Sequence, residues 1–160
     1  MDTQAKKQAL RMLTYGLYVI TSGKGAEVSA GTVNWLSQAS FIPPLVVAGV
    51  KKERELYKTI KSEGVFVVNI LGTGQERLAE EFFRPVVVDV EGGLLSGHKT
   101  TTKMTGIPII SSALSFLECK VTDCIERGDH SILVGEVIEA GIQSLESPLE
   151  MRTTGWFYGG

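Results

Sequence analysis

The chain has 160 residues, of which 43% are hydrophobic and 21% are charged, and its net charge is −2 at pH 7. Wholesale disorder is therefore excluded, and residues 1–160 are expected to form a single domain. The scattered, balanced charges count against a nucleic-acid partner, and no apolar run approaches the ~20 residues that a membrane helix needs. The first residues lack the apolar region of a signal peptide, so a cytoplasmic location is expected.

Apolar periodicity predicts the elements of the first third of the chain. Residues 4–14 are expected to form an amphipathic helix. Strands are predicted at 17–22 and 27–34, joined as a hairpin by a glycine-containing turn, and at 45–50 after two prolines. The apolar side of the first helix is expected to carry Ala9, Leu10, Met12 and Leu13.

The middle of the chain combines two helices with one buried strand. A helix is predicted over 52–61, followed by a strand over 65–71 that is apolar on both alternating faces and is therefore expected at the centre of a sheet. The sequence Thr73-Gly74-Gln75-Glu76 has capping-box spacing and predicts a helix that runs to Phe83. Residues 84–112 read as a long loop with one short strand at 86–90.

The last third predicts two long strands, at 114–125 and 131–140, before an aromatic and glycine-rich tail at 153–160. About six or seven strands and three short helices are predicted, and they do not alternate regularly as in a doubly wound parallel sheet. A mainly antiparallel barrel with peripheral helices is expected instead. Cys119 and Cys124 are five residues apart in one predicted strand, so they are expected on opposite faces and not in a disulfide.

Common catalytic and nucleotide-binding motifs are missing. The turn at Gly72-Thr73-Gly74 has Arg77 in place of the third glycine of a dinucleotide fingerprint, so it reads as a simple turn before a helix. Gly92 and Gly97 have P-loop spacing, but His98 stands where lysine is required. No GxSxG or CxxC sequence occurs, and the chain has only two histidines, so no metal site is predicted.

Three segments carry polar groups suited to a ligand, although each also has a plain structural interpretation. Residues 31–40 form a strand end rich in small, hydroxyl and amide residues. This composition suits the binding of an anion, but an ordinary loop at the end of a strand would have the same composition. Residues 51–54 carry cations near a helix start, which suits a phosphate or is a solvated helix face. His130 follows Gly128-Asp129 at a turn and faces a cleft or the surface.

In this order, the segments resemble the flavin reductase-like family, whose fold is an antiparallel Greek-key split β-barrel that binds FMN. The similarity runs from about residue 9 to residue 141. Residues 34–41 with 52–54 are particularly similar to the flavin reductase domain of flavodiiron proteins and to flavoredoxin-like members. The stretches that carry the resemblance are Leu13–Thr21, Thr32–Ser40, Pro43-Pro44-Leu45, Val68–Leu71, Leu117–Cys119 and Gly128–Val137.

The resemblance implies a homodimer with a flavin near the subunit interface, FMN rather than FAD. Lys52 and Arg54 would hold its phosphate, and His130 would lie near the nicotinamide of NAD(P)H. The indole of Trp35 would stack on the flavin or restrict nicotinamide access. The segment implied to line the flavin comprises Thr32, Val33, Asn34, Trp35, Ser37, Gln38, Ala39 and Ser40.

The first hypothesis for function is therefore an NAD(P)H-dependent flavin reductase. It needs no acid–base pair from the protein, because the flavin carries the chemistry. The alternative is a tightly FMN-bound electron-transfer protein, reduced by a partner such as rubredoxin without direct NAD(P)H oxidation. A small barrel that binds oligonucleotides is a third possibility, against which the net charge of −2 counts.

Overall fold

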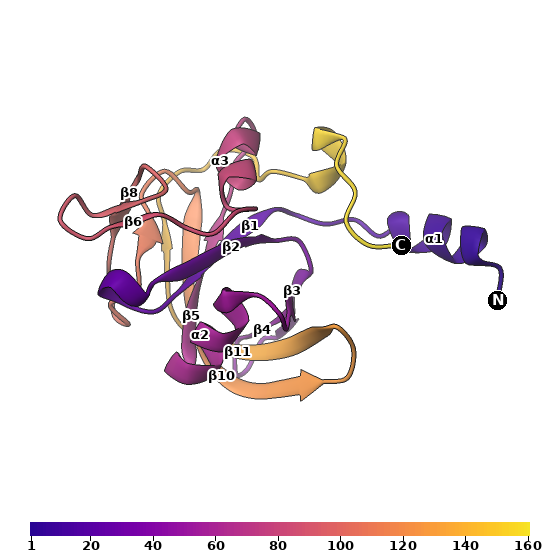
Figure 1. Ribbon diagram of the computed structural model, residues 1–160, viewed down its shortest axis with the longest axis horizontal. Helices are drawn as coiled ribbons and strands as arrows, with labels where there is room; N and C mark the ends of the chain where they lie inside the picture. The colour runs from indigo at the N-terminus through magenta and orange to yellow at the C-terminus, as the bar shows by residue number, and fades with distance from the viewer.

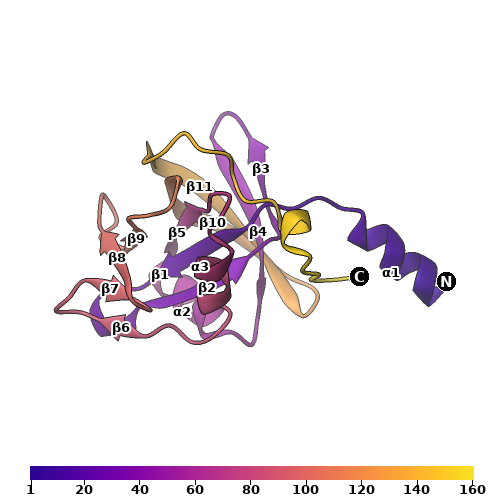
Figure 2. The same ribbon diagram turned by 90° about the horizontal axis from the view of Figure 1, so that it is seen from above.

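The computed structural model describes residues 1–160 and is built around one seven-stranded antiparallel sheet (Figures 1 and 2). The strand order is β2-β1-β5-β10-β11-β4-β3. The strands are β1 (Tyr18–Ser22), β2 (Ser29–Val33), β3 (Leu36–Ser40), β4 (Leu45–Lys51), β5 (Val65–Ile70), β10 (Ser115–Glu126) and β11 (His130–Ile142).

The sheet rolls into an open barrel. Its edge strands β2 and β3 are joined by only Asn34 and Trp35, and β2 contacts β4 across the opening. β5 lies between β1 and β10, which agrees with the central position predicted for residues 65–71. The β1–β2 and β10–β11 hairpins also form as predicted. The expected mainly β split barrel is thus confirmed.

Helix α2 (Glu55–Glu63) covers one side of the barrel, where it contacts β1, β2 and β5. Its buried residues Leu56, Tyr57 and Ile60 recur at helical spacing and join the barrel core. Gly64 ends the helix with φ 68°, a left-handed conformation that glycine adopts without steric cost. The helix begins three residues later than residues 52–61 predict, so Lys52 and Arg54 precede it.

Residues 84–112 are not the long loop that the sequence predicts. They contain the short strands β6 (Val88–Asp89), β7 (Leu94–Leu95), β8 (His98–Thr101) and β9 (Ile109–Ile110), which form a second antiparallel sheet. Asn69 on β5 joins the two sheets, because its buried side chain donates to the Val19 carbonyl and accepts from the Ile110 N–H. Two-residue strands give no detectable periodicity, which explains the error.

Helix α3 (Glu76–Glu81) differs from the prediction at both of its ends. The Thr73 hydroxyl donates to the Ser147 carbonyl at 3.2 Å and does not cap the helix, and the helix ends two residues before Phe83. Leu78, Ala79 and Phe82 are buried, but Phe83 is exposed.

Helix α1 (Thr3–Arg11) is shorter than the predicted residues 4–14 and extends away from the barrel (Figures 1 and 2). Asp2 caps it by accepting from the N–H groups of Gln4 and Ala5. None of its residues is buried, so its apolar side has no partner within the chain. No helix of the structure has the length and apolarity needed to span a membrane.

The opposite orientation predicted for the two cysteines is wrong. Cys119 is buried in the barrel core, and Cys124 packs against the same core. Register shifts at Glu118/Cys119 and Val121/Asp123 break the simple alternation of β10, so parity along the sequence no longer fixes the face. Both thiols are free, as expected.

Candidate functional site

A cavity of about 750 Å³ lies between β2, the start of α2 and residues 156–158. Its volume falls within the ~300–1,000 Å³ usual for small-molecule sites. The lining comes from the residues around β2 (Ala30, Gly31, Thr32, Val33, Asn34), the β4–α2 junction (Gly49, Val50, Lys51, Glu53, Arg54), residues 83–86, His130, Met151 and the aromatic residues 156–158.

The wall at β2 is formed by an edge strand, whose outer backbone groups are not paired within the main sheet. The Thr32 N–H donates to the Phe82 carbonyl at 3.2 Å, and its hydroxyl donates to the Ala79 carbonyl at 2.7 Å. Because N–H groups alternate along a strand, Ala30 presents its N–H on the same outer side as Thr32. Gly31 allows β2 to approach α2 closely, since a Cβ at this position would lie 3.3 Å from Leu56. This edge can therefore donate backbone hydrogen bonds to a ligand.

Three cationic side chains line the cavity: Lys51, Arg54 and Arg84. Arg54 is the residue before α2, and its guanidinium donates to the Phe83 carbonyl at 3.2 Å. That contact holds the cation at the positive end of the helix dipole, an arrangement that suits a phosphate. Lys51 forms an ion pair with Glu53 at 3.4 Å.

His130 is fixed by hydrogen bonds on both ring nitrogens. Its Nδ1 lies 2.9 Å from Asp129 Oδ1 and its Nε2 lies 2.7 Å from the Tyr158 hydroxyl. A carboxylate only accepts, so Nδ1 carries the proton, and in the neutral ring Nε2 is left to accept from Tyr158. The hydrogen bond from His130 holds the pKa of Asp129 below its ordinary value. The only acceptor of the neutral imidazole, Nε2, is therefore engaged by Tyr158 in this structure.

Aromatic rings surround this histidine. Trp35 lies 4.6 Å from the His130 ring and 5.3 Å from the Tyr158 ring, measured between centroids. Trp156 meets Phe83 edge to face at 5.2 Å. Trp35 does not line the cavity itself but lies directly behind His130, Gly49 and Tyr158, which do. Its indole N–H is buried and has no hydrogen-bond partner.

The structure brings together about half of the residues that sequence reasoning assigned to a site. Thr32, Val33, Asn34, Arg54 and His130 line the cavity. Asn34 is buried, with its amide 3.1 Å from the Met151 sulfur. The flavin roles of all these residues stay predictions.

The other predicted residues lie elsewhere. Lys52 does not line the cavity, whereas its neighbour Lys51 does. Residues 36–40 form the edge strand β3 rather than a loop, and on it Ser37, Gln38 and Ala39 are exposed while Ser40 is half-buried. They do not line the cavity of this chain, and their contact with a flavin stays a prediction.

Sequence reasoning missed Arg84 and left open the role of residues 156–158. Arg84 gave little signal because it lies in a stretch without periodicity. The aromatic cluster Trp156-Phe157-Tyr158 was visible in the sequence, but only the fold shows that it lines the cavity.

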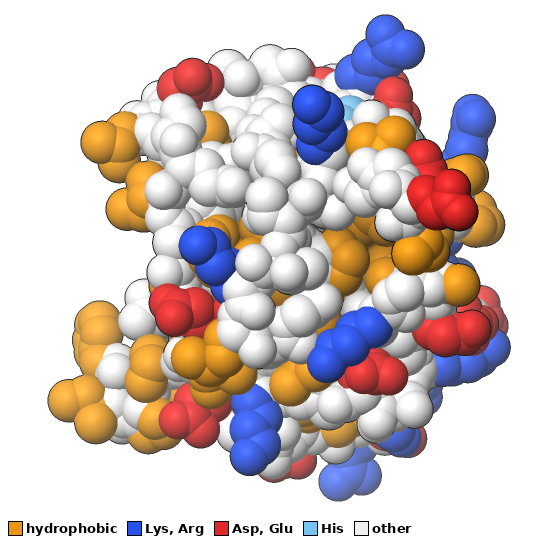
Figure 3. Space-filling view, turned by 90° about the vertical axis from the view of Figure 1, so that its left-hand side faces the viewer, with side chains coloured by type: hydrophobic (Ala, Val, Ile, Leu, Met, Phe, Trp, Pro, Cys, Tyr) orange, Lys and Arg blue, Asp and Glu red, His pale blue; other side chains and the backbone are white.

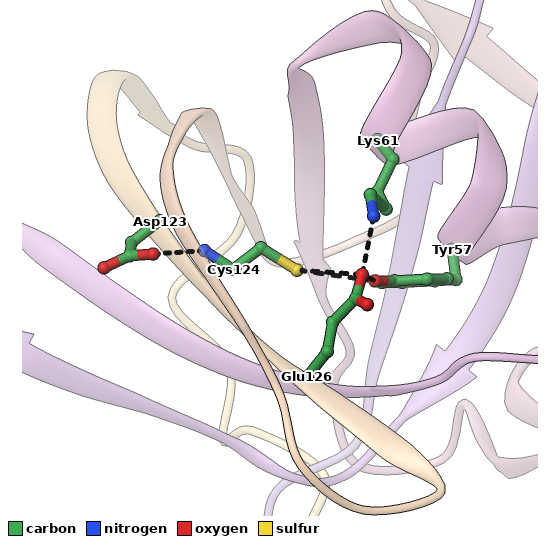
Figure 4. A network of polar contacts seen from close by, with 5 residues as sticks. All are labelled: Tyr57, Lys61, Asp123, Cys124 and Glu126. Atoms are coloured by element: carbon green, nitrogen blue, oxygen red, sulfur yellow. Dashed lines mark hydrogen bonds and ion pairs between the residues drawn. The ribbon is translucent and has the colours of Figure 1, made fainter.

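A second polar cluster joins α2 to β10 away from the cavity (Figure 4). The Tyr57 hydroxyl donates to Glu126, and Lys61 lies 2.5 Å from the same carboxylate. Burial raises the pKa of Tyr57, and the hydrogen bond from Lys61 holds the pKa of Glu126 below its ordinary value. None of these residues lines the cavity, so the cluster is a contact between elements.

The family model for the flavin reductase like domain matches residues 10–157 of this sequence. The chain belongs to the flavin reductase like family. The "Diflavin flavoprotein A 1" of Synechocystis sp. is 32% identical over 163 residues, covering 99% of this chain and 28% of that protein. The chain thus spans only about a quarter of the diflavin flavoproteins that it matches.

Shorter members of the flavin reductase like family match over more of their length. The "NADH-dependent FAD reductase" of Streptomyces globisporus is 34% identical over 128 residues, covering 78% of this chain and 68% of that protein. The solved structure of the NADH:FAD oxidoreductase SgcE6 of Streptomyces globisporus C-1027, in complex with NAD and FAD fragments, superposes with a TM-score of 0.78. It is 28% identical and covers 94% of this chain and 90% of that one.

The residues of the cavity fit a flavin. A planar ring system needs an apolar slot with backbone donors at its edge, which β2 supplies, and a phosphate needs cations, which Lys51, Arg54 and Arg84 supply. The unpaired indole N–H of Trp35 leaves one further buried donor beside the site. No group of three or more His, Cys, Asp or Glu side chains is arranged to hold a metal ion.

Proposed function

We propose that this chain is an NAD(P)H-dependent flavin reductase that holds FMN in the cavity at β2. One observation carries the proposal: the outer edge of β2, the Arg54 cation and the His130 imidazole line a single cavity. Membership of the flavin reductase like family supports it. So does the similarity to an NADH-dependent FAD reductase.

The chain's own residues bind and orient, while the flavin carries the electrons. The backbone N–H of Ala30 on the outer edge of β2 binds the polar edge of the ring system, and Arg54 binds the phosphate. His130, oriented by Asp129, offers Nε2 to the nicotinamide. When bound, the flavin would supply the two-electron acceptor for the hydride of NAD(P)H.

FMN suits this cavity better than FAD. The three cations gather in one cavity of about 750 Å³, which matches a cofactor with one terminal phosphate. The test titrates the flavin-free protein with FMN, FAD and riboflavin and follows NADH and NADPH oxidation with each. FMN is expected to bind most tightly and to support turnover. Tighter binding of FAD would correct the cofactor, and turnover with no flavin would refute the proposed function.

A second function is favoured by the similarity to diflavin flavoproteins, which extends over 99% of the chain. In this second function, the chain binds FMN tightly and takes electrons from a protein such as rubredoxin. Stoichiometric FMN that survives desalting, together with negligible NAD(P)H oxidation and fast reduction by reduced rubredoxin, would favour this function over the first.

We also propose that the chain forms a homodimer in the cytoplasm. Apolar side chains are exposed on two elements that lack a partner in the chain: Leu10 and Leu13 near α1, and Phe41 and Ile42 after β3. The two free thiols suit a reducing compartment. Light scattering is expected to give twice the mass of one 17.3 kDa chain, and Leu13→Glu is expected to lower it. A monomer at micromolar concentration would contradict the dimer.

A further inference from the structure

Residues 155–160, which we call the strap, line one side of the cavity with almost no backbone bonding. The only backbone hydrogen bond of this segment to the protein runs from the Trp156 N–H to the Thr154 hydroxyl. Side chains hold the rest: Trp156 packs against Phe83, the Arg11 guanidinium lies 4.7 Å from the Phe157 ring, and Tyr158 bonds to His130 and packs on Trp35. Gly155 and Gly159 have φ values of 74° and 93°, a left-handed conformation that glycine adopts without steric cost. The strap is thus attached by few, separable contacts.

The strap hides the acceptor that the proposed function needs. The Tyr158 hydroxyl lies 2.7 Å from Nε2 of His130, and only 12% of the histidine side chain is exposed. A nicotinamide cannot bond to Nε2 while Tyr158 donates to it, because the neutral ring has one acceptor lone pair there. Tyr158 and the nicotinamide therefore exclude one another at His130.

The closed strap also leaves a buried donor unsatisfied. A Cβ placed on Gly159 would lie 3.0 Å from Cζ2 and 3.9 Å from Nε1 of Trp35, so the Gly159 backbone covers that edge of the indole. The indole N–H is buried there with no acceptor. Burying an unpaired donor costs free energy. A ligand with an acceptor at this position would make the hydrogen bond that the strap does not make with the indole N–H. Trp35 and His130 together thus present one donor and one acceptor, with their rings 4.6 Å apart.

We propose that the strap is a competitor of the nicotinamide, and that its displacement lets the carboxamide bond to both Trp35 and His130. The carboxamide is complementary to the pair: its carbonyl accepts from the indole N–H, and its NH₂ donates to Nε2 of His130. This inference rests on the proposed function, because it needs a nicotinamide substrate at this cavity.

The test measures the Kd of NAD⁺ for the FMN-loaded protein by calorimetry, together with KM and kcat for NADH. Tyr158→Phe keeps the ring but removes the hydroxyl that holds the strap on His130. It is expected to lower Kd and KM by roughly two- to tenfold, since the open fraction rises while kcat is unchanged. Trp35→Phe removes the N–H donor but keeps an aromatic ring, and is expected to raise both by a similar factor. These opposite shifts distinguish competition between the strap and the nicotinamide from a general loosening of the cavity, which would change both variants in the same direction.

Tyr15→Phe is the matched control, because Tyr15 packs against the core and lies outside the cavity lining. It is expected to leave Kd and KM unchanged, and a shift equal to that of Tyr158→Phe would overturn the inference. In flavin-free protein, acrylamide is expected to quench the fluorescence of Trp35 and Trp156 more strongly in Tyr158→Phe than in Tyr15→Phe. Equal quenching would also overturn it.

The acceptor and donor assignment is tested with the 3-acetylpyridine analogue of NAD⁺, which keeps the carbonyl but lacks the NH₂ group. The wild-type protein is expected to bind NAD⁺ more tightly than the analogue, while Trp35→Phe weakens both ligands. Equal affinities of the two ligands would contradict the bond to His130. A wild-type protein that binds FMN but neither binds NAD⁺ nor oxidises NADH would instead refute the proposed function.

Discussion

Asp129, His130 and Tyr158 form a chain of hydrogen bonds in which each group fixes the next. The carboxylate of Asp129 sets the tautomer of His130, and Tyr158 then occupies the free nitrogen. Gly128-Asp129-His130 could be singled out from the sequence as a turn before a strand. The part played by Tyr158 could not, because 28 residues separate it from His130 and only the fold brings them together.

The contribution of His130 to substrate binding is isolated in the Tyr158→Phe background, where the strap's bond to the histidine is already absent. Adding His130→Ala to that variant is expected to lower kcat/KM for NADH by about tenfold, because one oriented hydrogen bond is lost. The Kd for FMN is expected to stay within about twofold. Unchanged turnover would remove His130 from the mechanism.

Arg54 is predicted to act on the phosphate of the flavin. Arg54→Met is expected to raise the Kd for FMN by about tenfold or more, since a charge-assisted bond is lost, while the Kd for riboflavin is unchanged. Lys58→Met, on the exposed side of α2, is the control. Fluorescence titration measures both constants, and equal losses for FMN and riboflavin would place the phosphate elsewhere.

Elements with a strong apolar period could be predicted, and elements without one could not. β5 carries valine on both faces, and it lies in the centre of the sheet as expected. β3 was missed because Leu36–Ser40 is mostly small and polar, and its pairing with β4 comes from its place at the sheet edge. The two-residue strands β6, β7 and β9 have no period to detect.

Asn69 is expected to be the main polar connection between the two sheets. It is fully buried and bonds to Val19 of β1 and Ile110 of β9. Asn69→Leu leaves those backbone groups unpaired and is expected to lower the free energy of unfolding by about 2–4 kcal/mol. Urea unfolding measures this, and Thr122→Val on the exposed end of β10 serves as the control. A loss below about 1 kcal/mol would contradict the role of Asn69 as the main polar connection.

The contact of Glu81 on α3 with His98 on β8 predicts a dependence on pH. The hydrogen bond from His98 holds the pKa of Glu81 below its ordinary value of 4.5. A carboxyl group with a lowered pKa stabilises the folded state when the pH is above its ordinary pKa. This stabilisation is lost as the pH falls through the lowered pKa. Glu81→Gln is therefore expected to cost less than about 1 kcal/mol at pH 6, and this difference should shrink below pH 4.5. Thermal unfolding of both proteins over pH 3–6 measures it, and a difference independent of pH would contradict the assignment.

The molecule as a whole places its ligand cavity where the barrel is open. The open edge at β2, the start of α2 and the strap meet there, although they are far apart in the sequence. Acidic and basic side chains are interspersed on the face shown in Figure 3, in keeping with the net charge of −2. The barrel could be predicted from strand patterns and family resemblance, whereas the closure of the cavity by residues 156–158 needed the structure.

The reductase activity is tested most directly by the visible spectrum of the FMN-loaded protein after anaerobic addition of NADH, repeated with Tyr158→Phe. The oxidised flavin band is expected to bleach promptly in the wild-type protein, and the half-maximal bleaching rate is expected at a lower NADH concentration in Tyr158→Phe. A bound flavin that stays oxidised with NADH and NADPH, yet bleaches with dithionite, would contradict the proposed reductase activity.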